Sequence, residues 1–306
     1  MKGTVTKSTG SWYFVREESG QMFKARIRGK FRLGNIQHTN PVAVGDTVDF
    51  EVDKDGLAVI TKIHERKNYI IRRSVNLSKK THIIASNIDK AFLIATVNNP
   101  KTSFGFIDRF LVTCEAYRIP AVIVINKTDA YDSEQLKLVE EYKSIYQKIG
   151  YDTIEISAHT RLNLDELKTK LKGITSLVAG HSGVGKSTLL NKLNPGLNLK
   201  TSEVSDFNQK GQHTTTFAEM YEWPFDGFCI DTPGIREFGL VDMEKEEIQN
   251  YFPEIFQLKS ECKFDNCLHI NEPKCAVIKA VQDGEIAVSR YENYVGFLEE
   301  IENKTS

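Results

Sequence analysis

The sequence predicts a multidomain α/β protein with an N-terminal β-barrel, a central α/β domain and a helical C-terminal domain. Three observations support this prediction. Residues 1–68 contain several short strand-like runs, separated by turn residues, and no convincing helix, as in a small barrel. Residues 69–240 alternate apolar runs with segments of helical spacing, as in a parallel sheet covered by helices. Residues 241–306 have a helical pattern around three clustered cysteines.

The composition is that of an ordinary soluble globular protein. Of the 306 residues, 40% are hydrophobic and 26% are charged, which argues against a disordered or fibrous chain. The apolar runs are shorter than the roughly 18 residues that cross a bilayer. Residues 1–6 lack the apolar core of a signal peptide. We therefore expect a cytoplasmic protein with no membrane partner. The net charge is −1, so a polyanionic partner has to be sought in local charge clusters.

One predicted barrel strand carries a row of positive charges. Strands are predicted at residues 12–15, 22–27, 47–52 and 57–60. Basic residues alternate with other residues in the second strand and beyond it: Lys24, Arg26, Arg28, Lys30 and Arg32. Side chains at this spacing share one face of a strand. The row suits phosphate contacts with a nucleic acid, although a solvated strand face has the same pattern.

Other residues near the barrel leave their roles open. Three neighbouring aromatic residues could stack on bases, but at least one is expected in the barrel core: Trp12, Tyr13 and Phe14. A basic linker beginning at Arg66 and Lys67 either contacts RNA or packs against the next domain.

The central domain is predicted to be a parallel sheet. Strands are expected at residues 91–97, 121–125, 153–156, 174–179 and 227–230. Helical spacing is found around residues 107–114, at 133–149 and 164–171, and from residue 186 onward. In such a sheet, ligands bind at the loops that follow the carboxyl ends of the strands.

The loop after residues 174–179 has the phosphate-binding pattern GxxxxGKS. Its glycines allow backbone amides to surround phosphate oxygens. Lys186 would reach the β and γ phosphates, and the Ser187 hydroxyl would bind Mg²⁺. A strand before the loop and a helix after it provide the required context. The residues assigned to nucleotide binding in this loop are Gly180, Ser182, Gly183, Val184, Gly185, Lys186, Ser187 and Thr188.

A second motif selects guanine. Asn126, Lys127 and Asp129 form the NKxD pattern directly after the strand at residues 121–125. The Asp129 carboxylate can accept two hydrogen bonds, from guanine N1–H and from its exocyclic amine, and adenine lacks this donor pair. A polar turn is the alternative for an isolated pattern. Beside a phosphate loop, the pattern predicts binding of GTP and GDP with Mg²⁺.

Two further elements complete the predicted nucleotide site, and their order is unusual. Ser157 and Ala158 end a strand in the place of the backbone element that supports guanine O6. Asp231 and Gly234 fit the DxxG pattern, in which the aspartate holds Mg²⁺ through water and the glycine amide senses the γ phosphate. In ordinary GTPases the phosphate loop precedes NKxD, whereas here it follows. The sequence therefore predicts a circularly permuted P-loop GTPase domain.

The C-terminal domain carries a candidate metal site. Five cysteines in a chain without an export signal argue against a disulfide framework. Cys262, Cys267, His269 and Cys275 supply three thiolates and one imidazole. This is a full tetrahedral shell for one structural Zn²⁺, with no position left open for catalysis. Reduced cysteines without a metal are the alternative.

The chain resembles a known family, that of the ribosome small subunit-dependent GTPase A (RsgA, also called YjeQ). Besides the nucleotide and cysteine motifs, the resemblance rests on these segments: Arg28-Gly29-Lys30-Phe31-Arg32, Val44-Gly45-Asp46, Asn87-Ile88-Asp89, Asp108-Arg109-Phe110-Leu111, Gly211-Gln212-His213-Thr214-Thr215-Thr216, Phe252-Pro253-Glu254, Gly284-Glu285-Ile286 and Ser289-Arg290-Tyr291. The family usually has arginine where Gln212 stands.

The resemblance implies three domains: an RNA-binding OB-fold over residues 1–68, the permuted GTPase domain over 69–240 and a helical zinc domain over 241–306. It also implies GTP hydrolysis that is slow alone and stimulated by the small (30S) ribosomal subunit during its maturation. The implied partners are this subunit and its 16S rRNA. We expect the protein to be a monomer.

The residue that activates water is not the usual one. Many GTPases have a glutamine directly after DxxG, but here this position is Ile235, which cannot hydrogen-bond to water. His213 is the candidate, because a neutral imidazole can position or deprotonate water. A solvent-exposed loop histidine is the alternative. Thr215 is assigned as the Mg²⁺-binding switch threonine, with Thr214 and Thr216 as alternatives. The catalytic assignments are thus His213, Lys186 and Thr215.

Two other functions are compatible with parts of the sequence. A signalling or transport GTPase would explain the nucleotide motifs but not the basic row or the cysteine cluster. A nucleic-acid-binding module with an inactive nucleotide site would explain the basic row. The intact Lys186, Ser187, Asp129 and Asp231 argue against that second possibility.

Overall fold

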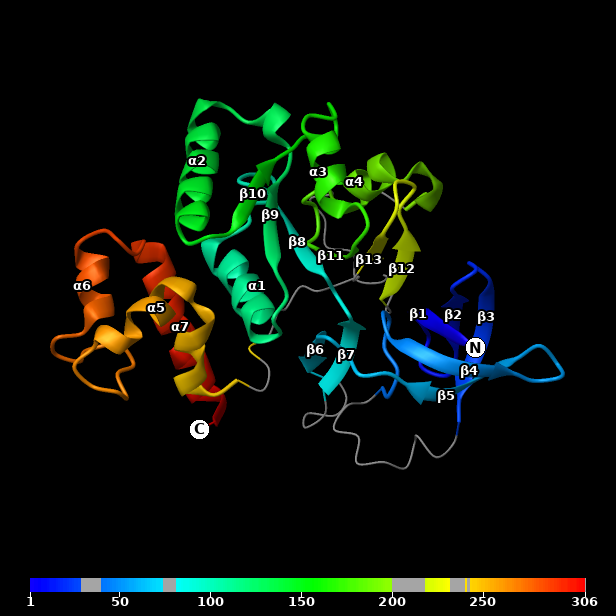
Figure 1. Ribbon diagram of the computed structural model, residues 1–306. Coiled ribbons are helices and arrows are strands. Elements are labelled where there is room, and N and C mark those ends of the chain that lie inside the picture. Colours follow the sequence, from blue (N-terminus) through cyan, green and yellow to red (C-terminus); the bar gives the residue numbers. More distant parts are fainter. Residues whose placement is uncertain (29–39, 74–80, 200–217, 232–239, 241–242, 306) are drawn as a thin grey trace.

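The molecule consists of an N-terminal barrel, a central sheet covered by helices, and a C-terminal group of helices (Figure 1). The computed structural model describes residues 1–28, 40–73, 81–199, 218–231, 240 and 243–305. The predicted fold class is confirmed: a barrel, an α/β part and a helical part that carries the cysteines. Within the described residues, no helix is both long enough and apolar enough to span a membrane.

The barrel is closed by five strands. They are β1 (Lys2–Ser8), β2 (Tyr13–Glu17), β3 (Met22–Ile27), β4 (Thr47–Val52) and β5 (Ala58–Ile63). They pair in the order β1-β2-β3-β5-β4, and β4 returns to pair with β1. Alternate side chains point inward and form the core, among them Val5, Tyr13, Val15, Ala25, Phe50 and Ile60. Of the three neighbouring aromatic residues, Tyr13 lies in the barrel core, as predicted for at least one of them.

A hairpin links the barrel to the central domain. It consists of β6 (Tyr69–Arg73) and β7 (Thr81–Ser86). The buried Asp46 carboxylate accepts hydrogen bonds from Arg66 Nε and Nη2, both 2.7 Å long, and from Ser86 Oγ at 2.6 Å. Gly45 has a φ of +93°, and a Cβ there would lie 2.0 Å from the Ser86 carbonyl oxygen. Arg66 thus packs the linker against the barrel, where it is satisfied by Asp46.

The central sheet is parallel except at one edge. Its strands are β8 (Lys90–Ala95), β9 (Ala121–Ile125), β10 (Asp152–Glu155), β11 (Thr175–Ala179), β12 (Glu219–Glu222) and β13 (Phe228–Asp231). They lie in the order β10-β9-β8-β11-β13-β12, with β12 antiparallel to β13. This is a sheet that an unpermuted chain could also build, because pairing depends on neighbouring strands and not on where the chain begins.

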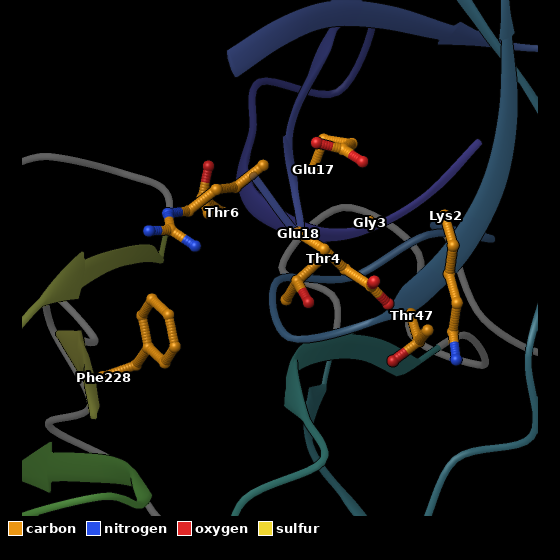
Figure 2. A pocket seen from close by; sticks show the side chains of 9 residues that line it. Lys2, Gly3, Thr4, Thr6, Glu17, Glu18, Thr47 and Phe228 are labelled. Carbon is orange, nitrogen blue, oxygen red and sulfur yellow. The ribbon is translucent and has the colours of Figure 1, made fainter. Parts of the chain in front are cut away.

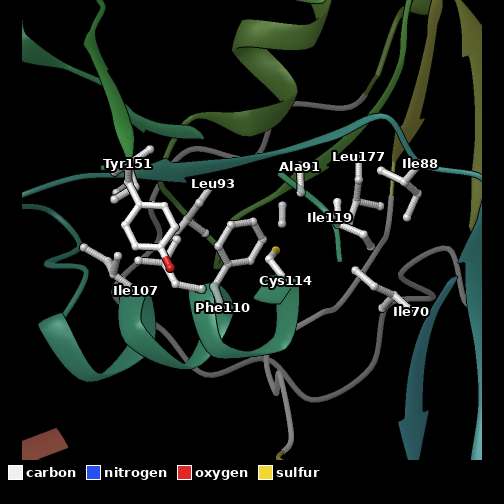
Figure 3. Packing of buried hydrophobic residues seen from close by; sticks show 14 of the residues in the cluster. Ile70, Ile88, Ala91, Leu93, Ile107, Phe110, Cys114, Ile119, Tyr151 and Leu177 are labelled. Carbon is white, nitrogen blue, oxygen red and sulfur yellow. The ribbon is translucent and has the colours of Figure 1, made fainter. Parts of the chain in front are cut away.

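Two helices cover each face of this sheet. Strand β8 shows why, because its side chains alternate between two cores. Ala91, Leu93 and Ala95 pack with α1 (Phe104–Ala116) and α2 (Ser133–Lys148), and Figure 3 shows Phe110 and Cys114 of α1 in this layer. Phe92 and Ile94 face the other core, which also contains α3 (Leu164–Leu171) and α4 (Lys186–Leu193). Short 3-10 turns cover Thr128–Ala130 and Pro195–Leu197.

The barrel joins the central domain at the antiparallel edge strand. Strand β12 pairs with β1 through Lys7 and Glu219. Two ion pairs support this joint, Lys7–Glu219 at 3.1 Å and Arg16–Glu222 at 2.9 Å. A cavity of about 290 Å³ lies here between the barrel strands and Phe228 (Figure 2). Phe228 begins β13, so this cavity lies at the opposite end of that strand from Asp231.

The C-terminal helices pack on α1, on the side of the central domain away from the barrel (Figure 1). They are the 3-10 helices Lys245–Tyr251 (η4) and Lys259–Glu261 (η5), and the α-helices α5 (Pro253–Leu258), α6 (Ala276–Gln282) and α7 (Val288–Thr305). Pro253 begins α5, because its missing N–H costs nothing in the first turn of a helix.

A buried ionic network fastens α7 to the central domain. The Arg290 side chain is 1% exposed. It donates from Nη1 to Asp108 Oδ1 of α1 at 2.8 Å, and from Nε to Glu254 Oε1 of α5 at 2.7 Å. Tyr146 Oη and Asn293 Nδ2 also donate to Asp108, at 2.7 and 2.6 Å. All three charges are therefore hydrogen-bonded, which offsets part of the cost of burying them.

We predict that Arg290→Met loosens α7. Removing one partner of a buried ionic network leaves an uncompensated charge, at a cost of about 3–5 kcal/mol. Amide hydrogen exchange in α7 should therefore become at least about a hundredfold faster. Lys137→Met is the matched control, because Lys137 pairs with Glu134 on the surface of α2 with both side chains more than 70% exposed. Equal exchange in the two variants would show that the network does not hold α7.

Candidate functional site

The predicted nucleotide motifs meet at one edge of the central sheet. The GxxxxGKS loop follows β11, the NKxD residues follow β9, Ser157 follows β10, and Asp231 ends β13. These strands are parallel, so their carboxyl ends lie on the same edge. Four segments up to about a hundred residues apart in sequence thus surround one place.

The phosphate loop has a shape that requires glycine at two positions. Gly180 has a φ of +153°, and a Cβ there would lie 2.7 Å from the Ile94 carbonyl oxygen. Gly185 has a φ of +90°, and a Cβ there would lie 2.6 Å from Asn126 Nδ2. The loop leads directly into α4, whose first turn contains Lys186, Ser187 and Thr188. Free amides at the start of a helix are suited to phosphate oxygens, so the loop fits a nucleotide.

Asn126 and Lys127 hold the neighbouring loops together. The Asn126 amide group donates to the Val184 carbonyl at 2.9 Å and accepts from the Ala158 amide at 3.1 Å. Lys127 Nζ donates to the carbonyl of Gly183 at 2.8 Å and to that of Asn99 at 2.6 Å. Burial lowers the pKa of Lys127. Asn126 therefore links the phosphate loop to the segment of Ser157 and Ala158 that follows β10.

Charged side chains lie beside these loops, where a nucleotide would bind. Asp129 has a quarter of its carboxylate exposed, and His159 Nδ1 lies 3.5 Å from it. Lys186 Nζ and Asp231 Oδ1 form a close ion pair, both at least four-fifths buried. This pair brings the cation expected at phosphate next to the carboxylate expected at Mg²⁺. Ser157 is buried, and its hydroxyl accepts from the Thr160 amide at 2.9 Å.

Several predicted site residues lie outside the described residues. They are His213, Thr215 and Gly234, the alternatives Thr214 and Thr216, and Lys30 and Arg32 of the basic row.

The four predicted metal ligands form one compact cluster. Their ligand atoms lie within 4.8 Å of one another. Cys262 Sγ is 3.8 Å from Cys275 Sγ, and His269 Nδ1 is 3.5 and 3.3 Å from the same two sulfurs. Bonds of about 2.3 Å to sulfur and 2.0–2.1 Å to nitrogen give tetrahedral edges of about 3.5–3.8 Å. The cluster therefore fits Zn²⁺.

The surroundings of the cluster prepare His269 as a ligand. Its Nε2 lies 3.1 Å from Gln249 Oε1, and this amide oxygen can only accept, so Nε2 carries the proton. Burial lowers the pKa of His269, which favours the neutral ring with a free lone pair on Nδ1. Burial raises the pKa of Cys267 to about 12, so a thiolate there needs a cation beside it. Gln249 was missed in the sequence, because nothing local distinguishes it from other polar residues.

We predict that Cys275→Ser removes the metal from the purified protein. Loss of one of four ligands opens the tetrahedral shell, and a serine hydroxyl is a poor substitute for a thiolate. Elemental analysis should find one zinc per chain in the unchanged protein and much less in the variant. Cys114→Ala is the control, because Cys114 is buried in α1 and lies outside the cluster. One zinc per chain in Cys275→Ser would contradict the assignment.

The described part of the basic row is exposed as predicted. Lys24, Arg26 and Arg28 point to solvent, whereas the alternate Ala25 and Ile27 are buried in the barrel. The Lys24 ammonium group lies 4.2 Å from the centre of the Trp12 ring. A cation beside an aromatic face is the combination that binds phosphates and stacks on bases.

Comparison with known proteins identifies the family. Residues 63–241 match the family model of the RsgA GTPase, and residues 2–60 match that of the RsgA N-terminal domain. The chain is 56% identical over 302 residues to the small ribosomal subunit biogenesis GTPase RsgA of Christiangramia forsetii, covering 98% of this chain and 96% of the relative. It is 53% identical to the protein of the same name from Bacteroides fragilis, covering 99% and 97%.

Solved structures agree with this result. The crystal structure of YjeQ from Thermotoga maritima superimposes with a TM-score of 0.81 at 39% identity, covering 98% of both chains. The structure of YloQ, described as a circularly permuted GTPase, superimposes with a TM-score of 0.77 at 33% identity, covering 99% of this chain and 95% of the other. The chain therefore belongs to the RsgA family of circularly permuted GTPases.

Proposed function

We propose that this protein binds the small (30S) ribosomal subunit and hydrolyses GTP to GDP and phosphate late in the maturation of that subunit. Hydrolysis would be stimulated by the subunit and would time the release of this protein or of other assembly factors. The observation that carries the proposal is the full-length similarity to relatives named small ribosomal subunit biogenesis GTPase. The convergence of the nucleotide motifs at one sheet edge supports it independently.

Within this proposal, each part of the nucleotide site has a role. Asp129 recognises guanine, while Asn126 and Lys127 fix the loops around it. The loop from Gly180 to Gly185 and Lys186 bind the phosphates. Mg²⁺, when bound, neutralises phosphate charge, and its assigned ligands are Ser187, Thr215 and Asp231. The structural zinc stabilises the fold around its four ligands.

The permuted chain order gives GTP a route to the C-terminal domain. The DxxG segment that begins at Asp231 leads directly into the C-terminal segment. Leu240, a few residues further on, is 2% exposed and packs in the C-terminal core with Ile248 and Phe252. A change at Gly234 upon hydrolysis would therefore act on these helices through Leu240.

The remaining parts of the proposal concern the partner and the cell. The exposed row on β3 would contact the phosphates of 16S rRNA. The boundaries near residues 68 and 240 separate the OB-fold, GTPase and zinc domains, and the two family models divide the chain close to residues 60 and 241. A monomer in the cytoplasm fits this role.

The proposal is tested by GTP hydrolysis alone, with small subunits and with large subunits. We expect strong stimulation by small subunits only. Combined replacement of Lys24, Arg26 and Arg28 by alanine should weaken subunit binding and reduce its dependence on salt, because three phosphate contacts are lost. The rate of GTP hydrolysis by this triple variant in the absence of subunits should be unchanged. If the protein binds GTP but small subunits do not stimulate hydrolysis, it is still a GTP-binding protein but the ribosomal role is refuted. A protein activator would then be sought.

We also predict that His213→Ala loses the stimulated turnover. Position 235 is isoleucine, so another side chain has to orient the attacking water, at a contribution of about 10²–10⁴-fold. Affinity for GTP should stay the same, because His213 lies outside the motifs that bind the nucleotide. The matched control is His64→Ala, since His64 pairs with Asp49 in the barrel. Unchanged stimulated turnover in His213→Ala would exclude it as the positioning group.

A further inference from the structure

A fifth loop lies at the nucleotide edge of the sheet. It runs from Thr96 to Ser103 and connects β8 to α1. Because β8 lies between β9 and β11, this loop lies between the NKxD loop and the phosphate loop. No nucleotide motif includes it. Lys127 already contacts it through the Asn99 carbonyl at 2.6 Å.

The loop touches the phosphate loop through one histidine. His181, the second residue of the GxxxxGKS pattern, places Nε2 2.8 Å from Thr102 Oγ1. Its ring also meets the ring of Phe106, in the first turn of α1, edge to face at 5.4 Å. Thr102 is fully buried, and its carbonyl accepts from Tyr142 Oη at 2.6 Å. The histidine is thus hydrogen-bonded to a buried residue of the central domain.

The directions of these hydrogen bonds follow from their chemistry. His181 Nδ1 lies 3.2 Å from the Ser182 carbonyl oxygen, which can only accept, so Nδ1 carries a proton. Burial lowers the pKa of His181, so the ring is neutral and Nε2 is an acceptor. The Thr102 hydroxyl therefore donates to His181, while its oxygen accepts from the Thr96 amide at 3.0 Å. Each donor in this chain of hydrogen bonds therefore faces an acceptor.

We infer that His181 is a positioning residue of the phosphate loop, and that the Thr102 hydroxyl fixes it. The inference rests on the proposed binding of nucleotide by this loop. His181 follows Gly180, whose backbone is freer than that of other residues. A side-chain tie at the next residue reduces the conformational freedom that the loop loses when it closes around phosphates. Without this tie, nucleotide should bind more weakly and dissociate faster.

The test measures the affinity and dissociation rate of a fluorescent GDP, N-methylanthraniloyl-GDP, on the full chain. Thr102→Val removes the hydroxyl at nearly constant shape and should weaken binding about fivefold to tenfold. His181→Ala should do the same. His181→Gln should restore most of the affinity, because its amide oxygen can accept in place of Nε2. Thr113→Val is the matched control, since Thr113 is a buried threonine of α1, the helix that follows this loop, and its hydroxyl donates to the Arg109 carbonyl.

The double variant Thr102→Val with His181→Ala decides whether the two residues act as one unit. If they do, it binds no more weakly than His181→Ala alone. The inference would be overturned if the losses of affinity of the two single variants multiply in the double variant. It would also be overturned if Thr102→Val and Thr113→Val weaken binding equally. Should Thr102→Val fail to fold, the comparison of His181→Ala with His181→Gln gives the answer, and equal affinities would overturn it.

A variant of the phosphate lysine separates this inference from the proposed function. Lys186→Ala should abolish nucleotide binding if the loop binds phosphates at all. Retained binding in Lys186→Ala would refute the nucleotide site itself. Lost binding in Lys186→Ala, with no effect at His181 or Thr102, would refute only the positioning role.

Discussion

The nucleotide edge depends on one buried side chain, the amide of Asn126. It is 1% exposed and uses both ends, donating to the backbone of the phosphate loop and accepting from the backbone after β10. A buried polar group without a partner costs more than a normal hydrogen bond gains. Losing Asn126 would therefore leave two backbone groups unsatisfied and free three loops at once. Gly185 exists as glycine for the same reason, because a side chain there would collide with Asn126.

The C-terminal helices depend on the central domain in two different ways. The Arg290 network joins α7 and α5 to Asp108 of α1, and Arg109 adds a second contact by pairing with Glu300 and lying 4.7 Å from the Phe297 ring centre. The DxxG segment precedes the same helices along the chain, and Leu240 packs in their core. The first connection is a buried hydrogen-bonded network, and the second begins at Asp231, the residue assigned to Mg²⁺. The change at the DxxG segment that we propose upon hydrolysis would thus act on helices that are anchored at α1.

The cysteine cluster completes a domain with a small core. The C-terminal core contains Cys267 and Cys275 among its buried residues, so two of the four ligands also take part in packing. Tyr291 and Tyr294 donate to the carbonyls of His269 and Leu268 at 2.7 and 2.9 Å, which ties the ligand loop to α7. Loss of the metal would therefore spread to the helix that Arg290 fastens to α1.

The sequence by itself determined the three-part fold, the nucleotide motifs and the set of four metal ligands. These features are local: the glycine pattern, the NKxD turn, the alternation of strands and helices, and the spacing of cysteines can each be recognised within a few residues. The row on β3 was predictable for the same reason, because a period of two fixes the face of a strand. Only the permuted order of the motifs is a long-range feature of the sequence.

The tertiary structure decided which residues serve these local motifs from elsewhere in the chain. Asp108 and Arg290 are 182 residues apart, Thr102 and His181 are 79 apart, and Gln249 reaches His269 across 20. The edge-strand joint between Lys7 and Glu219 spans 212. No short-range pattern marks such pairs, because each residue taken alone is compatible with a solvated surface. Their partners become known only when the sheet order and the packing of the helices bring them together.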